Sequence, residues 1–207
     1  MKETGTPDRV PTRREEYAEA TRRAIVEAAR SLFCKKGFFA TRIEDIANLA
    51  RVSPATVYAV FGGKQDLLCT VMQIWLQAPI VTATLEAVVA VRQPAEVIRL
   101  LARSCRIMRE EFGDIVRLLL KTAPHDGAAT EMLAAATAQY RRALLPFAQR
   151  LEEMRCLKSD LTAKKAIDIL WFYFGYSALF TLVDENGWSY ARAEKWLAEE
   201  ALRAVSR

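Results

Sequence analysis

Apolar residues recur at intervals of three and four along most of this chain, the spacing that places side chains on one face of an α-helix. A first long example runs from about Glu15 to Lys36, with Ala28 and Phe33 among its inward positions, and Gly37 follows as a helix-ending residue. No segment shows the strict alternation of a half-buried strand. The pattern therefore predicts an all-α fold.

Two short helices separated by a tight turn are predicted next. The first covers Ile43–Ala50, and the second begins with Ser53 as N-cap and Pro54 at the first helical position. The second helix buries Val57 and Phe61, which lie four residues apart. Helices this short need support from the rest of the fold. The pair suits a unit in which the first helix braces the second, and the second enters the major groove of DNA.

Six further helices are expected, which brings the total to about nine. Pro79 ends or kinks one of them, Pro94 begins another, and Pro146 bends a third. The expected segments are Lys64 to Pro79, Pro94 to Phe112, Asp114 to Thr122, Ala128 to Met154, Thr162 to Asp184 and Tyr190 to Val205. We divide the chain into a flexible arm (1–14), a helix-turn-helix DNA-binding domain (15–64) and a helical ligand-binding and dimerisation domain (65–207).

Composition and charge add a large core and a basic first third. Of the 207 residues, 52% are hydrophobic, which argues against disorder. The net charge is +5, and its excess is uneven: residues 1–64 hold 12 Lys and Arg against 8 Asp and Glu, whereas residues 65–207 hold 18 against 17. A basic excess beside the two short helices favours binding to nucleic-acid phosphates. An ordinary solvated surface remains the alternative.

Patterns typical of enzymes and metal sites are missing from the sequence. The chain has one histidine, His125, and no Cys-x-x-Cys pair, phosphate-binding glycine loop or dinucleotide-binding motif. We therefore expect no enzymatic activity, no cofactor and no metal. The cysteines are expected to be reduced thiols of a cytoplasmic protein, with a redox-sensing pair as the alternative. They are Cys34, Cys69, Cys105 and Cys156.

The segment from Ala166 to Val183 is apolar on both sides of the expected helix, and Asp168 is its single charge. Its length is marginal for a membrane span, and its polar residues and charged flanks favour a helix buried inside protein. One side would pack its own domain, and the other would meet a partner or line a cavity. With the last helix, this segment predicts a four-helix homodimer interface. The residues expected there are Trp171, Phe174, Ala178, Leu182, Trp196 and Leu197.

Residues 22–72, about a quarter of the chain, resemble the N-terminal domain of the TetR/AcrR family of bacterial transcriptional regulators. The resemblance rests on many spaced positions: Ile25, Ala28, Ala29, Leu32, Phe33, Lys36, Gly37, Phe38, Ala40, Thr41, Ile43, Asp45, Ile46, Ala47, Ala50, Val52, Ser53, Thr56, Val57, Tyr58, Phe61, Lys64, Asp66, Leu67 and Leu68. It implies a homodimer that binds an operator palindrome. It also implies that a small molecule in the C-terminal domain changes the spacing of the two DNA-binding domains and relieves repression.

DNA contacts are expected from the two short helices and their flanks. Thr41 can cap the first helix and offer its hydroxyl to a phosphate, and Arg42 adds a charge. An exposed Tyr58 would reach a phosphate or a thymine methyl, with half-burial as the alternative. The resemblance assigns DNA contacts to Thr56 and Tyr58 and phosphate binding to Lys64. The full set is Thr41, Arg42, Arg51, Ser53, Pro54, Ala55, Thr56, Tyr58 and Lys64.

Two departures from the family pattern bear on how DNA is bound. Arg51 stands in the turn where the family usually has glycine, a position that often adopts positive φ. The second helix offers little polar chemistry, since Ala55, Ala59 and Val60 provide methyl contacts at most. We expect a domain that contacts the DNA backbone more than it reads bases, with greater weight on DNA shape.

A ligand cavity is expected in the C-terminal domain. We place Trp75, Cys105, Met108, Leu119, Met132, Tyr140, Phe172 and Tyr176 around it. These side chains indicate a hydrophobic or aromatic ligand. Arg103, Arg106 and Arg109 offer a cation to an acidic ligand, but a solvated helix face is the favoured interpretation.

The sequence thus predicts a transcriptional repressor that binds a palindromic operator as a homodimer and is released by a small ligand. An activator, or a helical architectural protein that binds DNA without an effector, is the alternative. A cavity of several hundred Å3 would favour the first hypothesis over the architectural one.

Overall fold

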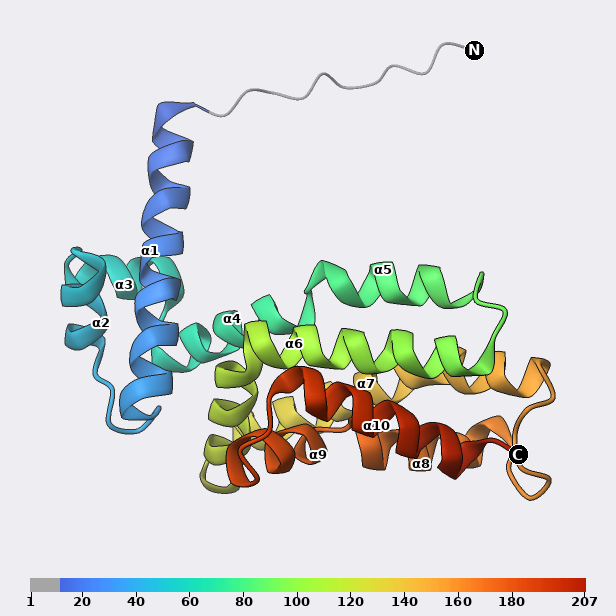
Figure 1. Cartoon of the computed structure of the whole chain (residues 1–207). Helices are drawn as coiled ribbons and strands as arrows, with labels where there is room; N and C mark the ends of the chain where they lie inside the picture. Colours follow the sequence, from blue (N-terminus) through green and yellow to red (C-terminus); the bar gives the residue numbers. More distant parts are fainter. Residues whose placement is uncertain (1–11) are drawn as a thin grey trace, which may run out of the picture. The chain divides into compact units, whose positions relative to one another are not determined.

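The computed structural model describes residues 12–207, which form ten α-helices without a strand (Figure 1). The chain divides into two compact units, Met1–Val71 and Met72–Arg207. The division falls inside helix α4, a few residues after the expected boundary between residues 64 and 65. The expected arm lies mostly outside the described residues. Its last two residues, Arg13 and Arg14, begin α1, because Thr12 and Glu15 form a capping box there.

Unit 1 is built from α1 (Arg13–Lys36), α2 (Ile43–Ala50), α3 (Pro54–Phe61) and the first half of α4 (Lys64–Leu76). These bounds confirm the long helix and the two short ones. Figure 1 shows α2 and α3 packed beside α1. The core of the unit is formed by side chains that face inward from all four helices: Ile25, Ala29, Phe33, Ile46, Ala47, Val57, Leu67, Leu68 and Val71.

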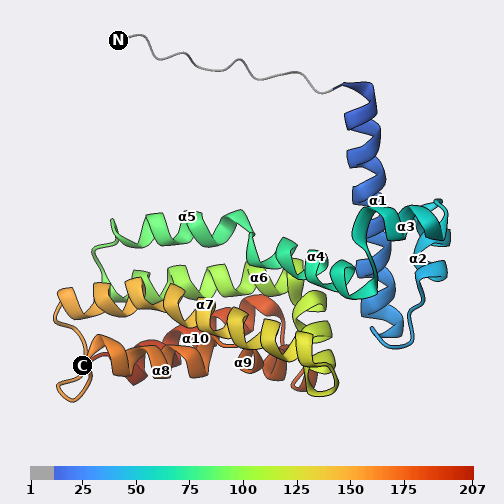
Figure 2. The ribbon, with the colours of Figure 1, turned by 180° about the vertical axis from the view of Figure 1, so that it is seen from behind.

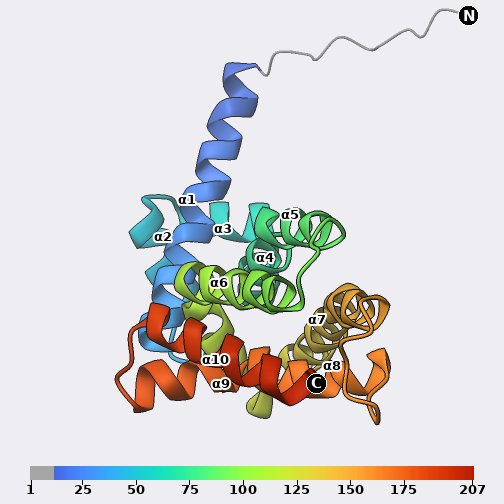
Figure 3. The same ribbon diagram turned by 45° about the vertical axis from the view of Figure 1, so that its right-hand side comes forward.

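Unit 2 is a helical bundle. It contains α5 (Pro79–Val88), α6 (Pro94–Thr122), α7 (Gly127–Glu153), α8 (Ala163–Phe174), α9 (Ser177–Phe180) and α10 (Tyr190–Val205). Helix α6 contacts α7 and α10, and α8 contacts the same two helices, so the four enclose one core. Helix α5 packs across α6 and α7 (Figure 3). Figure 2 shows the bundle from behind, with α7 in front.

The bounds of several expected helices differ from the structure. Pro79 does not merely end a helix: it takes the first position of α5, where its missing N–H costs nothing. The two helices expected over 94–112 and 114–122 are one helix, α6, which runs through Gly113. Helix α7 begins at Gly127 because the Asp126 side chain accepts a hydrogen bond from the Ala129 N–H.

The single helix expected over 162–184 is broken at Gly175. Helix α8 ends at Phe174, and the chain continues as the short α9 and a π-helical turn, Thr181–Glu185. At Gly175 the backbone leaves the helical region, with ψ at −164°. A Cβ at this position would lie 2.5 Å from the Trp171 carbonyl oxygen, so only glycine fits.

Two stretches are long and apolar enough to span a membrane by length and composition, Lys64–Val88 and Ala163–Glu185. The first is interrupted at Pro79 and the second at Gly175. Part of each stretch is buried inside the protein: Leu67, Leu68 and Val88 in the first, and Leu170 and Phe174 in the second. Such helices are common in the cores of helical proteins, so these stretches are weak evidence for a membrane span.

Candidate DNA-binding surface and ligand cavity

Helix α3 presents one face to solvent and holds the other in the core of unit 1. The Ser53 hydroxyl accepts a hydrogen bond from the Thr56 N–H at 3.1 Å, as expected for an N-cap. Val57 and Phe61 are buried, which confirms the predicted inner face. Tyr58 is 52% exposed, so its side chain is accessible to solvent rather than packed into the core.

The rest of the α3 surface is small and largely apolar. Pro54, Ala55 and Ala59 are exposed, and Thr56 is half-buried with its hydroxyl 2.9 Å from that of Ser53. Tyr58 is therefore the largest exposed side chain among the expected contacts on this helix. The geometry suits a helix whose contacts come from one aromatic ring, its capped N-terminus and a few methyl groups.

Thr41 does not cap α2. The N-cap is Arg42, whose backbone N–H donates to the Asp45 carboxylate at 3.3 Å. Thr41 is buried, and its hydroxyl donates instead to the Gly37 carbonyl at 2.8 Å, so it fastens the loop between α1 and α2. The capping prediction is wrong because the helix begins one residue later than Thr41 would require. The Arg42 side chain is exposed.

Lys64 supports the same loop from the start of α4. Its ammonium donates to the Phe38 carbonyl at 3.0 Å and the Thr41 carbonyl at 3.1 Å, and it lies 4.5 Å from the centre of the Phe38 ring. These contacts satisfy the charge within unit 1. Its expected phosphate contact therefore stays a prediction, and the structure gives Lys64 a clear positioning role.

Arg51 follows α2 in the left-handed region, with φ 58° and ψ 42°. From the sequence, either the turn differs slightly from the family's or Arg51 tolerates a strained backbone, and the observed φ corresponds to the second of these. The Arg51 N–H closes the helix by donating to the Asn48 carbonyl at 3.2 Å. The side chain is exposed and free to extend towards a phosphate beside α3.

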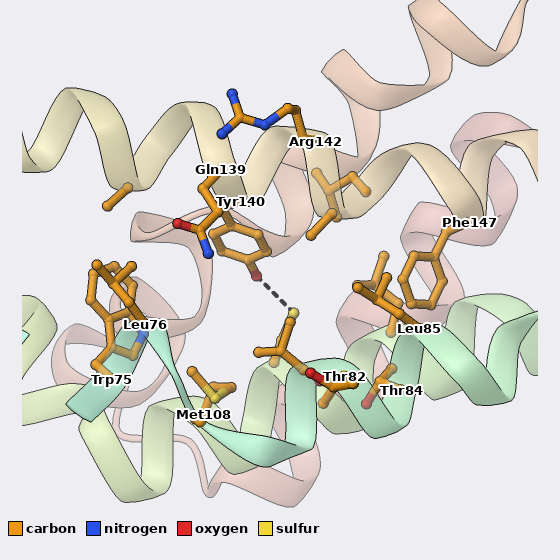
Figure 4. Close-up of a pocket in the computed structure, with 18 of the residues that line it drawn as sticks. Trp75, Leu76, Thr82, Thr84, Leu85, Met108, Gln139, Tyr140, Arg142 and Phe147 are labelled. Atoms are coloured by element: carbon orange, nitrogen blue, oxygen red, sulfur yellow. Dashed lines mark hydrogen bonds between the residues drawn. The ribbon is translucent and has the colours of Figure 1, made fainter. Parts of the chain in front are cut away.

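Unit 2 contains a cavity of about 460 Å3. Its wall is formed by the end of α4 together with α5, α6 and α7, as Figure 4 shows. Trp75, Met108 and Tyr140 contribute large side chains to the wall, and Gln139 and Thr82 contribute polar ones. The volume lies within the usual range for small-molecule sites.

Four of the eight expected ligand residues line this cavity, namely Trp75, Cys105, Met108 and Tyr140. Tyr176 lies just behind the wall, with its ring 6.0 Å from those of Trp75 and Tyr140. The other three are placed elsewhere: Leu119 is in the core, Met132 does not line the cavity, and Phe172 is on the surface. Helical spacing could not distinguish these sites, because α7 and α8 each have apolar residues on more than one face.

A hydrogen-bonded chain connects the cavity wall to the break after α8. The Tyr140 hydroxyl donates to the Phe174 carbonyl at 2.6 Å and lies 2.9 Å from the Cys105 sulfur (Figure 4). Burial raises the pKa of the Cys105 thiol and raises that of the Tyr140 phenol well above its ordinary value. Both groups are therefore neutral near pH 7.

Comparison with known proteins identifies the N-terminal segment. Residues 25–70, which hold the second half of α1, α2, α3 and the first turns of α4, match the family model described as bacterial regulatory proteins, tetR family. The likeness to the tetR family is thus shown for this segment of the chain.

Two curated proteins are similar to part of this chain. The HTH-type transcriptional repressor NicS of Pseudomonas putida is 38% identical over 60 residues, or 29% of this chain. The HTH-type transcriptional regulator HbdR of Aromatoleum sp. is 42% identical over 50 residues, or 24% of this chain. The matched segments span only 28% and 22% of those relatives.

Solved structures match across both units. The SmeT–triclosan complex has a TM-score of 0.73 and 20% identity, and covers 91% of this chain and 92% of its own. A regulator from Saccharomonospora viridis in complex with choline has a TM-score of 0.74 and 16% identity, and covers 92% and 99%. At these identities the likeness shows the fold, which is all-α as predicted.

The residues expected at a dimer interface differ in burial. Phe174, Leu182 and Leu197 are buried inside the chain, so they are not available to a partner. Trp171 and Ala178 are half-buried, and Trp196 on α10 is 40% exposed. Phe172 on α8, which was expected at the ligand cavity, is 73% exposed. The apolar surface of these helices is thus centred on Phe172 rather than Phe174, because α8 turns the Leu170 and Phe174 side of the helix into the bundle core.

Arg109 is a buried cation in the wall of this cavity, which overturns the favoured interpretation of a solvated helix face for this residue. Its side chain is 2% exposed and lines the cavity, as does the solvent-exposed Arg142. Arg106 and Arg103 on the same helix lie outside the cavity wall. The 3.6-residue repeat placed Arg109 beside Cys105 and Met108, and that neighbourhood was the available signal.

Proposed function

We propose that this chain is a transcriptional repressor that binds a palindromic operator as a cytoplasmic homodimer and is released by a small, largely apolar ligand. Two features together support the proposal: an exposed, capped α3 in unit 1 and a cavity of about 460 Å3 in unit 2. An architectural DNA-binding protein would need the first feature but not the second. A relative named as a repressor, and structures of this fold in complex with triclosan or choline, support the same proposal.

DNA binding is assigned to the exposed groups around α3. Tyr58 would contact a phosphate or thymine methyl, and the N-terminal residues Ser53 to Thr56 would approach the groove. Arg42 and Arg51 would add two phosphate contacts from the flanks of α2. Thr41 and Lys64, whose polar groups bond the loop between α1 and α2, would hold these contacts in place.

The homodimer is proposed to form through α8 and α10. Phe172 and Trp196 supply exposed aromatic surface there, and Trp188 packs edge-on against Trp196 with ring centres 5.8 Å apart. Aromatic side chains of this kind are favoured anchors of protein interfaces. Two-fold symmetry would then match a palindromic operator.

The experiment that tests DNA binding begins with selection of duplexes from a random library by the purified full-length protein. A repressor enriches a two-fold symmetric site, whereas an architectural protein enriches none. On the selected site we expect Tyr58→Ala to weaken binding by about tenfold or more, because the ring and its hydroxyl are lost together. Tyr58→Phe should retain the part that depends on the ring.

Tyr17→Ala is the matched control for that variant. Tyr17 is also an exposed tyrosine of unit 1, but it lies in the first turns of α1 rather than on α3. Its removal should leave operator affinity unchanged. Equal affinity of the wild type and Tyr58→Ala, with both proteins folded by circular dichroism, would contradict the assignment of α3 as the DNA-binding helix.

A further inference from the structure

Arg109 is a buried cation without a carboxylate partner. Its side chain lies on α6 in the wall of the cavity and is 2% exposed. One terminal nitrogen donates to the Gly175 carbonyl at 3.2 Å, while its Nε has no hydrogen-bond partner. Buried polar groups are nearly always bonded, so a missing partner at this atom needs an explanation.

Other arginines of α6 show how this protein usually treats the same side chain. Arg106 pairs with Glu110 and Glu194, and Arg117 forms a two-pronged contact with Asp184 at 2.7 to 2.8 Å. Both are more exposed than Arg109. Among the residues the structure describes, no carboxylate forms an ion pair with Arg109.

The groups that face Arg109 leave its charge uncompensated. The guanidinium carbon lies 5.6 to 5.8 Å from the ring centres of Tyr140, Tyr176 and Phe180. Burial raises the pKa of Tyr176 as it does that of Tyr140, so both phenols are neutral near pH 7. Aromatic faces stabilise a cation only in part. A buried guanidinium without an anion is costly, and a bound anion would remove that cost.

The remainder of the wall indicates what the anion is attached to. Trp75, Val81, Leu85, Leu101, Leu144 and Phe147 line the cavity with apolar surface. Its other polar members are the uncharged Gln77, Thr82, Thr84, Ser104 and Gln139 and the solvent-exposed Arg142. A ligand that satisfies both parts therefore needs one anionic group and an apolar body.

We propose that this cavity binds a monocarboxylic acid with an aromatic or aliphatic body, whose carboxylate accepts hydrogen bonds from Arg109. This inference rests on the proposed function only for the role of the ligand as effector. A carboxylate matches the planar donor geometry of a guanidinium, and the guanidinium of Arg109 still has an Nε–H without a partner. The apolar body lies between α5, α6 and α7, beside Trp75 and Phe147.

The test measures binding by the full-length protein without DNA, by titration calorimetry and by the shift in melting temperature. The probes are two matched pairs: 2-naphthoate with 2-naphthamide, and decanoate with decanamide. We expect at least one acid to bind about tenfold or more tightly than its amide, because a charged hydrogen bond replaces a neutral one in a buried site. Acid binding should also raise the melting temperature.

Variants of two arginines of α6 assign the effect. Arg109→Met should abolish the preference for acid over amide, and Arg109→Lys should retain part of it. Arg103→Met is the matched control, because Arg103 lies on the same helix but is exposed and outside the cavity wall. It should leave the preference intact.

Several results would overturn the proposal. They are equal binding of acid and amide by the wild type, failure of both acids to bind, and an unchanged preference in Arg109→Met. If Arg109→Met does not fold, Arg109→Lys still tests the proposal. A folded Arg109→Lys that keeps the full wild-type preference for acid over amide would contradict the carboxylate site. Acids that bind at Arg109 without altering operator affinity would leave this site standing and would contradict only the effector role.

Discussion

Arg51 shows how one residue can carry both strain and function. It occupies the left-handed region at the end of α2, where a side chain costs about 1 kcal/mol relative to glycine. Nothing in the turn requires arginine for the backbone itself. An exposed cation beside α3 offers a physical reason to retain it, namely a contact to a DNA phosphate.

We predict that Arg51→Gly raises the free energy of unfolding of unit 1 by about 1 kcal/mol, because glycine adopts this conformation without steric cost. The same variant should weaken operator binding through loss of one phosphate contact, with a shallower dependence on salt concentration. Denaturant titration and binding isotherms at several salt concentrations measure the two effects.

Arg155→Gly is the control for that prediction. Arg155 also has positive φ, at 54°, but it lies in unit 2 between α7 and α8. Its replacement should raise stability without affecting DNA binding. A loss of stability in Arg51→Gly would show instead that contacts of the side chain outweigh the backbone strain.

At the scale of elements, the break between α8 and α9 depends on Gly175 and on two side chains that donate hydrogen bonds to backbone carbonyls at the break. The Phe174 carbonyl accepts from Tyr140, and the Gly175 carbonyl accepts from Arg109. Both donors line the cavity. The break is therefore physically connected to the cavity wall, and it lies in the segment proposed to carry the dimer surface.

We expect Gly175→Ala to destabilise unit 2 by about 1 to 3 kcal/mol, because its Cβ would meet the Trp171 carbonyl at 2.5 Å. That carbonyl cannot withdraw easily, since it accepts the Gly175 N–H at 2.8 Å. Gly127→Ala is the matched control, with no atom within 4 Å of an added Cβ at the start of α7. Thermal and denaturant unfolding compare the two; equal stability would mean that the break does not depend on the missing side chain.

At the scale of the whole molecule, the proposed homodimer turns on the exposed aromatic surface of α8 and α10. We predict that Phe172→Asp weakens dimerisation by about 2 kcal/mol or more, since it places a charge where an aromatic anchor would be desolvated. Light scattering and sedimentation across a concentration series measure the change. Monomer at every concentration in the wild type would contradict the dimer itself.

Val89→Asp is the control for a general effect of added charge. Val89 is 69% exposed, close to the 73% of Phe172, and it lies at the end of α5. It should leave the dimer intact. Equal weakening by the two variants would indicate a change in solubility or net charge rather than loss of a specific interface.

The sequence by itself determined the helices whose ends carry local signals. Ser53 and Pro54 begin α3, Ser189 begins α10, and Gly37 ends α1, because capping and turn preferences depend on neighbours along the chain. The inner face of α3 was equally local. These features, with the spaced positions of residues 22–72, were enough to predict the all-α fold and the likeness of the N-terminal segment to the tetR family.

Only the tertiary structure decided which faces of the longer helices are buried and which polar groups meet. Helices α7 and α8 are apolar on more than one side, so periodicity along α8 could not separate Phe174 in the core from Phe172 on the surface. In the sequence Arg109 resembles Arg103 and Arg106 of the same helix, yet only Arg109 of the three is buried in the cavity wall. The Lys64 ammonium donates hydrogen bonds to the carbonyls of Phe38 and Thr41, which lie more than 20 residues earlier in the chain. Such contacts arise when distant segments pack together, and spacing along the chain does not encode them.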